Sequence, residues 1–243
     1  MYINHTVFTA APDPSTRSDN ENKCFKVLDE LGISYERLEH DAAMTIDNCQ
    51  EIDQLLGTDM CKNLFLTNSA KSQYYLLLMP GNKQFRTKDV SRQIGSTRLS
   101  FGASDKMQEY LGVSPGSVTV MGLMFDTESN VRLLIDKELL KNEYICFHPC
   151  INTGSVKAKT ADIVEKFLPY TKHAPTYVEL LRQSGRKYLV LKTTNLTNAK
   201  QNAGPEGRSP LKVINPLVFW YDKMAASSGI HRNSRQQKII TAQ

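Results

Sequence analysis

The chain has 243 residues, of which 40% are apolar and 23% charged, and its formal net charge is +5. These values are typical of a globular protein with one sizeable α/β domain. No apolar run approaches the roughly 20 residues that cross a bilayer, and the polar start of the chain lacks the features of a secretory signal, so we expect a cytoplasmic protein without membrane association. The five cysteines are scattered and odd in number, which favours free thiols over a disulfide framework.

Charge is divided unevenly along the chain. Residues 181–243 carry eleven Lys and Arg residues against Glu206 and Asp222, a net charge of +9, which leaves −4 on residues 1–180. A basic extension on a mildly acidic body indicates a polyanion as partner, but a solvated extension without a partner fits the composition equally well. We predict a flexible segment at 1–21, a folded domain at 22–180 and a basic, partly ordered extension at 181–243.

Apolar spacing predicts the elements of the first half of the domain. Residues 24–31 have the spacing of an amphipathic helix, and Gly32 is a natural stop signal. The next expected elements, in chain order, are a strand at 33–40, a helix at 47–56, a hairpin of strands at 61–67 and 74–79, and short helices at 88–94 and 104–111.

The second half of the domain is richer in strands. The expected elements are strands at 117–125, 131–135, 144–148 and 155–157, a helix that begins at Thr160 and ends at Pro169, and a last strand at 176–180. Strands outnumber helices and are mostly joined as hairpins. This order predicts an α/β protein of the α+β type, with a central mixed or antiparallel sheet and flanking helices.

Lys62 interrupts an otherwise apolar strand. Alternation along that strand puts Lys62 on the same face as Leu64 and Leu66, and a charge at a buried-facing position is costly unless it is paired or lines a pocket. Lys62 is therefore a candidate site residue, and the alternative is a strand-end lysine whose ammonium reaches water. Asn63 is likewise either a site residue or a capping amide at a strand edge.

His148 ends the strand expected at 144–148 and shares a face with Tyr144 and Cys146. A histidine in this position is either functional or a satisfied structural residue, and the pattern leaves both open. Cys146, His148 and Cys150 contain zinc-binding atoms, but alternate strand residues followed by a proline lack the usual tetrahedral ligand spacing. We therefore expect neither a metal nor another cofactor.

A loop flanked by Gly112 and Gly116 enters the strand expected at 117–125. Glycine permits close approach of the backbone to a ligand, and successive amides can face an anion or a carbonyl oxygen. Many hairpins share this pattern, so by itself it indicates little.

Five motifs in order carry a family resemblance. They are KNLFL at 62–66, PGNK at 80–83 with FR at 85–86, RLSF at 98–101, LGVxPGSVT at 111–119 and FHPxxNT at 147–153. Together they resemble the ProX/YbaK superfamily of prolyl-tRNA editing domains, and most of all its freestanding ProX-type alanyl-tRNA(Pro) deacylases. The resemblance runs from about residue 22 to residue 180.

The resemblance implies the α+β fold of these editing domains and a trans-editing hydrolase that cleaves the ester of mischarged tRNA(Pro), chiefly alanyl-tRNA(Pro). Lys62 matches the essential lysine, which positions the substrate and stabilises charge, and Asn63 and His148 match polar residues that orient the aminoacyl group and the ribose. The implied substrate-binding residues are Gly116, Ser117, Val118 and Thr119 of a clasping loop, with Asn152 and Thr153. The implied partners are mischarged tRNA(Pro) and prolyl-tRNA synthetase.

The sequence contains no Ser-His-Asp set and no paired carboxylates at the matched positions. This agrees with a mechanism implied by the resemblance, in which a ribose hydroxyl of the substrate activates water and the protein positions it. A small pocket would admit alanine and reject proline. Such a second, editing site is needed because a synthesis site gains only ~1–3 kcal/mol of discrimination per methylene.

One residue departs from the family loop. The family reads Gly-Ser-Val-Thr-Pro, and here Val120 replaces the proline, which we expect to loosen the loop because proline restricts φ. The amino acid removed is therefore open, with cysteinyl- or seryl-tRNA as alternatives to alanyl-tRNA. A non-catalytic protein that binds tRNA or a synthetase through the basic extension is a further alternative.

Overall fold

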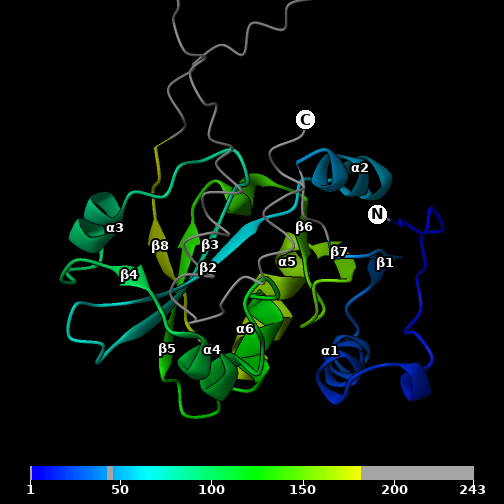
Figure 1. Ribbon diagram of the computed structural model, residues 1–243, viewed down its shortest axis with the longest axis horizontal. Coiled ribbons are helices and arrows are strands. Elements are labelled where there is room, and N and C mark those ends of the chain that lie inside the picture. The colour runs from blue at the N-terminus through cyan, green and yellow to red at the C-terminus, as the bar shows by residue number, and fades with distance from the viewer. Residues whose placement is uncertain (1, 43–45, 182–243) are drawn as a thin grey trace, which may run out of the picture.

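The computed structural model describes residues 2–42 and 46–181, which fold into two β-sheets with helices packed around them (Figure 1). The larger sheet has the strand order β4-β2-β3-β5-β8. Its strands are β2 (Lys62–Thr67), β3 (Tyr74–Met79), β4 (Ser100–Phe101), β5 (Val131–Asp136) and β8 (Thr176–Val178). β3–β5 and β5–β8 pair in parallel and the other pairs are antiparallel, so the expected mixed sheet is confirmed.

The smaller sheet is antiparallel, with the order β1-β7-β6. Its strands are β1 (Tyr35–Glu39), β6 (Tyr144–Phe147) and β7 (Gly154–Lys159). A parallel bridge between Met60 and Cys146 connects the two sheets, and the Cys61 amide donates to the Cys146 carbonyl at 3.2 Å. The start of β2 therefore lies beside the end of β6.

Helices surround the sheets, with α1 and β1 on one side of the molecule and α3 with β4 on the other (Figure 1). The α-helices are α1 (Asp19–Glu30), α2 (Ile46–Leu56), α3 (Thr87–Gln93), α4 (Ser104–Leu111), α5 (Thr160–Asp162) and α6 (Leu168–Thr171). Shorter turns are the 3-10 helices η1 (Pro14–Thr16), η2 (Val120–Met124) and η3 (Leu139–Lys141), and the π-helix η4 (Ile163–Phe167).

The larger sheet buries both of its faces. Phe65 of β2 and Leu76 of β3 belong to the main core, which also takes in α1, α4 and the smaller sheet. Leu64 and Leu66 belong to a second core on the other face, which Val90 of α3 covers. Because both faces of β2 are apolar, the strand reads as a nearly continuous hydrophobic run.

The β2–β3 hairpin confirms the strands expected at 61–67 and 74–79. Its turn is formed by Asn68, whose side-chain oxygen accepts from the amides of Ser72 at 2.9 Å and Gln73 at 3.3 Å. This is an asparagine turn of the kind that polar loops favour. The short helices expected at 88–94 and 104–111 are also confirmed, within one residue at each end.

The strand expected at 117–125 is wrong. Val120–Met124 form the 3-10 helix η2, and all five residues are buried. Gly122 permits the close contact with α4, because a Cβ there would lie 2.9 Å from Leu111 Cβ. An apolar run that is buried on every side has no period that separates a strand from a helix.

The helix expected to end at Pro169 instead continues to Thr171. The π-helix η4 precedes the proline, with the Leu168 amide bonded to the Ile163 carbonyl. This wider turn resets the hydrogen-bond register, so that Pro169 falls in the first turn of α6, where no amide hydrogen is needed.

The flexible segment expected at 1–21 makes defined contacts in its described part. The Asn4 amide donates to the Glu39 carbonyl at 2.9 Å, and Phe8 and Arg37 exchange backbone hydrogen bonds. α1 begins at Asp19 after its cap, Ser18, so residue 22 lies within that helix. The basic extension predicted at 181–243 lies outside the described residues, apart from Leu181.

Candidate functional site

Lys62 is the first residue of β2, and its Nζ donates to the Lys83 carbonyl at 3.4 Å. The residue is exposed, in agreement with the alternative of a strand-end lysine, because at the end of a strand the long side chain reaches the edge of the sheet. Loss of water around the ammonium lowers the pKa of Lys62 below its usual value. Its ammonium is therefore only partly hydrated.

The loop that receives Lys62 is anchored by a buried ion pair. Lys83 Nζ lies 2.8 Å and 3.0 Å from the two carboxylate oxygens of Asp136, and 2.9 Å from Glu138 Oε2. Burial by itself would lower the pKa of Lys83, but the hydrogen bonds from its ammonium to Asp136 and Glu138 outweigh burial and raise it. The Lys83 carbonyl is thus held in place for Lys62.

Asn63 is buried and follows Lys62 in the strand, so its side chain points to the opposite face of the sheet. Its Nδ2 donates to the Cys61 carbonyl at 3.3 Å. Its Oδ1 is buried and has no hydrogen-bond partner within residues 2–42 and 46–181. A buried acceptor without a partner is costly in a core, and this oxygen is free to accept a hydrogen bond from a bound group.

His148 follows β6 directly and is half-buried. Its Nδ1 lies 2.8 Å from the Gly154 carbonyl. A carbonyl oxygen can only accept, so the ring proton belongs on Nδ1 and Nε2 is left as an acceptor. Burial lowers the pKa of His148, and the nearby His40 lowers it further, so the ring is neutral at pH 7.

The predicted clasping loop contacts the segment that follows His148. Thr119 is fully buried, and its hydroxyl donates to the His148 carbonyl at 2.7 Å. The same hydroxyl accepts from the Met121 amide at 3.3 Å, which caps η2. Gly116 has a φ of +93°, and a Cβ there would lie 3.3 Å from Asn152 Nδ2, so glycine allows the two loops to meet.

The other loop residues differ in exposure. Ser117 and Val118 are buried, and the Ser117 amide donates to the Ser114 carbonyl at 3.0 Å, which closes the turn before η2. Thr153 is exposed, while its carbonyl accepts from the His40 amide at 3.0 Å. Thr153 therefore contributes its backbone to the fold and leaves its side chain at the surface.

The predicted site residues fall into two sets around the start of β2. One set contains the loops 116–119 and 148–153, which the Thr119–His148 hydrogen bond joins. Asn63 bonds to Cys61, whose amide in turn donates to the Cys146 carbonyl of β6. The other set is Lys62 with the Lys83 loop. No hydrogen bond joins Lys62 to His148 in the described part of the chain; the two side chains bond to the Lys83 and Gly154 carbonyls respectively.

Sequence reasoning missed several buried polar groups near the site. Asp136 follows the strand expected at 131–135, and a carboxylate directly after an apolar strand was the available signal for the Lys83 pair. His40 and Ser155 are also buried, and their ring and hydroxyl meet at 2.8 Å. Nothing in the local pattern relates two residues so far apart in the chain.

The thiols close to the site are not nucleophiles. Burial raises the pKa of Cys61 to about 12 and raises that of Cys146 well above its usual value. Both sulfurs therefore stay protonated at neutral pH, and the thiolate is the reactive form. Within residues 2–42 and 46–181, no group of three metal-binding side chains is placed to hold an ion.

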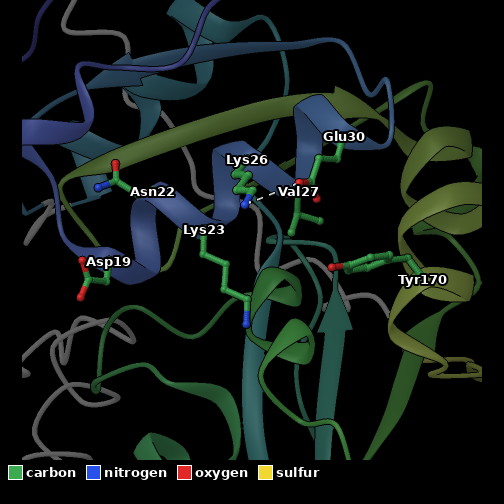
Figure 2. A pocket seen from close by; sticks show the side chains of 7 residues that line it. All are labelled: Asp19, Asn22, Lys23, Lys26, Val27, Glu30 and Tyr170. Atoms are coloured by element: carbon green, nitrogen blue, oxygen red, sulfur yellow. Dashed lines mark ion pairs between the residues drawn. The ribbon is translucent and has the colours of Figure 1, made fainter.

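A surface hollow of about 390 Å³ lies elsewhere, between α1 and Tyr170 of α6 (Figure 2). Its lining residues are Asp19, Asn22, Lys23, Lys26, Val27, Glu30 and Tyr170. Lys26 and Glu30 form an exposed ion pair of 3.7 Å across its rim. The hollow contains none of the predicted site residues.

No helix in the described ranges is long and apolar enough to cross a membrane.

Comparison with known proteins gives a consistent picture. The family model described as an aminoacyl-tRNA editing domain matches residues 40–166. The prolyl-tRNA editing protein ProX of Acetoanaerobium sticklandii is 34% identical over 136 residues, which cover 56% of this chain and 83% of ProX. Prolyl-tRNA synthetase associated domain-containing protein 1 of Mus musculus is 30% identical over 152 residues, covering 61% and 89% of the two chains.

A solved structure described as a candidate trans-editing enzyme for prolyl-tRNA synthetase has the same fold. Its TM-score is 0.52 at 16% sequence identity, and the match covers 69% of this chain and 99% of that one. The family match spans over half of the 243 residues and includes every site residue predicted above. The chain therefore belongs to the aminoacyl-tRNA editing domain family.

Proposed function

We propose that the protein is a trans-editing deacylase that hydrolyses the ester of mischarged tRNA(Pro), with alanyl-tRNA(Pro) as its main substrate. One observation carries this proposal: the editing-domain match at residues 40–166 contains Lys62, Asn63, His148 and the two loops that meet at the His148 carbonyl. A relative that is 34% identical is named a prolyl-tRNA editing protein, which supports the same substrate class.

The chemistry of ester hydrolysis suits these groups. Negative charge develops on the carbonyl oxygen in the transition state, and a fixed cation or amide hydrogens stabilise it. Lys62 supplies a cation that has no carboxylate within ion-pair distance in the described part of the chain, and it positions the substrate. The neutral His148 and the unpaired Asn63 oxygen offer acceptors for the ribose hydroxyl and the amino group.

Water is the nucleophile in this proposal. The Cys61 and Cys146 thiols are protonated, and neither loop presents a serine bonded to a histidine. A ribose hydroxyl of the substrate activates the water, and the protein holds both in place. Amino-acid choice is by size, since a pocket that fits alanine excludes the proline ring.

The test is deacylation of a panel of purified alanyl-, seryl-, cysteinyl- and prolyl-tRNA(Pro). We expect the wild type to hydrolyse alanyl-tRNA(Pro) fastest and Lys62→Ala to be slower by at least about 100-fold. Lys88→Ala, which removes an exposed lysine of α3, is the matched control and should keep the wild-type rate. Equal rates for Lys62→Ala and wild type would end the role of Lys62, and faster hydrolysis of another ester would reassign the amino acid.

The basic extension favours a second candidate function, a non-catalytic protein that binds tRNA or prolyl-tRNA synthetase. Residues 181–243 carry a net charge of +9, and relatives are named as synthetase-associated. Truncation after Leu180 tests this extension. If it binds tRNA, affinity and its salt dependence both fall, because each phosphate contact adds about 0.7–0.9 to the slope of log K against log salt. An inactive wild type that binds tRNA would favour this second function.

A further inference from the structure

His40 closes the end of β1 against the turn that follows His148. Its amide donates to the Thr153 carbonyl at 3.0 Å, which extends the pairing of Glu39 with Gly154 by one step. The side chain of His40 is buried although it is polar. A buried imidazole has to find partners for both ring nitrogens, and His40 does so.

The contacts of His40 define its protonation state. Nδ1 lies 2.8 Å from the Asp41 carbonyl, which can only accept, so Nδ1 carries the proton. Nε2 lies 2.8 Å from the hydroxyl of Ser155 and therefore accepts its proton. Burial lowers the pKa of His40 below its usual value, in agreement with a neutral ring. The two nitrogens are thus assigned opposite roles by fixed neighbours.

Ser155 links this histidine to the site. It is fully buried in β7, directly after Gly154. The Gly154 carbonyl accepts from His148 Nδ1 at 2.8 Å, and a Cβ on Gly154 would lie 3.3 Å from Pro149 Cγ, so the turn is tightly closed on itself. Hydrogen bonds therefore connect the Asp41 carbonyl to His40 and His40 to Ser155. The peptide bond between Ser155 and Gly154 continues this connection to the Gly154 carbonyl, which accepts from the ring of His148.

We propose that His40 and Ser155 are positioning residues, which hold the Gly154 carbonyl so that His148 keeps its proton on Nδ1 and presents Nε2 as an acceptor. The effect of these residues on the rate of deacylation rests on the proposed function, whereas their effect on the tautomer of His148 does not. An acceptor nitrogen is needed to receive a hydrogen bond from a ribose hydroxyl, whereas a ring with its proton on Nε2 would donate a hydrogen bond at that position instead.

Three substitutions separate this role from simple packing. Ser155→Ala removes the hydroxyl that donates to His40. His40→Leu removes Nε2, the acceptor of the same hydrogen bond. His40→Gln keeps an acceptor oxygen near the position of Nε2 and is the conservative rescue. Ser91→Ala is the matched control, because Ser91 of α3 is also buried. Its hydroxyl accepts one hydrogen bond, from the Leu99 amide at 3.2 Å.

The first measurement is the tautomer of His148 by long-range ¹H–¹⁵N NMR of the full chain at pH 7. We expect the wild type, His40→Gln and Ser91→Ala to show a protonated Nδ1 and an unprotonated Nε2. Ser155→Ala and His40→Leu should give averaged signals from two exchanging tautomers. A wild-type proton on Nε2, or unchanged signals in both disruptive variants, would overturn the proposal. Circular dichroism identifies the folded variants, and either disruptive variant is sufficient for the comparison.

The second measurement is deacylation kinetics on alanyl-tRNA(Pro). We expect Ser155→Ala and His40→Leu to lower kcat by about 10-fold with KM within twofold, because a misplaced group affects the transition state more than binding. An equal loss in Ser91→Ala would trace the effect to packing and contradict the proposal. If the wild type hydrolyses none of the esters, the proposed function fails, and the NMR result alone then decides the role of His40 and Ser155.

Discussion

The ammonium of Lys83 lies 2.8 Å from Oδ1 of Asp136, and both side chains are buried. The same carboxylate accepts from the amides of Glu138 at 2.8 Å and Leu180 at 2.9 Å. One acidic residue at the end of β5 therefore joins the loop after β3 to the segment after β8. The Lys83 carbonyl, fixed by this network, is the acceptor for Lys62.

Lys83→Met should destabilise the protein by about 3–5 kcal/mol, because it leaves the Asp136 carboxylate buried without its cation. Urea unfolding at pH 7 measures the change. The control is Lys137→Met, which breaks the exposed 2.7 Å pair with Glu179 and should cost at most about 1 kcal/mol. Similar values for the two variants would show that burial does not set the strength of the Lys83 pair.

Thr119→Val should weaken both stability and deacylation. The isosteric change removes the bond to the His148 carbonyl and the cap of the Met121 amide, a loss of about 1–3 kcal/mol for buried groups left unpaired. Thr119→Ser keeps the hydroxyl and should retain most of the stability. Thermal unfolding and the rate on alanyl-tRNA(Pro) measure the two effects, and a fully active Thr119→Val would remove this bond from the positioning of the loop.

Asp53→Asn should stabilise the protein at pH 7. Burial raises the pKa of Asp53 to about 6 in the folded state, so the folded protein holds this proton to higher pH than the unfolded chain does. The stability that the protonated carboxyl contributes is therefore full below about pH 4 and is lost as pH rises to about 6.

The asparagine oxygen can still accept from the Met60 amide, which lies 2.9 Å from Asp53 Oδ1. Because the carboxyl is half-buried and keeps some water, we expect a gain of about 1 kcal/mol at pH 7 and none below pH 4. Urea unfolding at the two pH values measures it. An equal gain at both pH values would exclude the titration of Asp53 as the cause.

Val120→Pro should be tolerated and should sharpen the choice of amino acid. Val120 is the first residue of η2, a position where proline needs no amide bond and its φ suits the helix. Proline reduces the freedom of the clasping loop, so we expect a larger ratio of kcat/KM for alanyl- over seryl-tRNA(Pro).

Val120→Ala is the control for this variant, since Val120 is fully buried and alanine removes its packing without restricting φ. An unchanged ratio in Val120→Pro would show that the valine does not account for any difference in amino-acid preference. A ratio that rises equally in Val120→Ala would assign the effect to the volume of the side chain.

Local patterns were sufficient for much of the fold. The hairpin of β2 and β3 and the helices α3 and α4 follow from apolar runs bounded by turn residues, and these signals act between neighbours in the chain. Local patterns failed at η2 and at Pro169. In the first case burial on all sides hides the period, and in the second the π-helix η4 moves the proline to a permitted position.

The sequence by itself determined the family and the candidate residues, since the motifs around Lys62, Asn63 and His148 are contiguous and ordered. Tertiary structure decided where those residues lie and what they contact. It showed Lys62 at an exposed strand end bonded to the Lys83 loop, and His148 held by Gly154. It also paired Lys83 with Asp136 and His40 with Ser155. Such pairs arise because folding brings distant polar groups into one buried place, where each must find a partner, and no local pattern records that requirement.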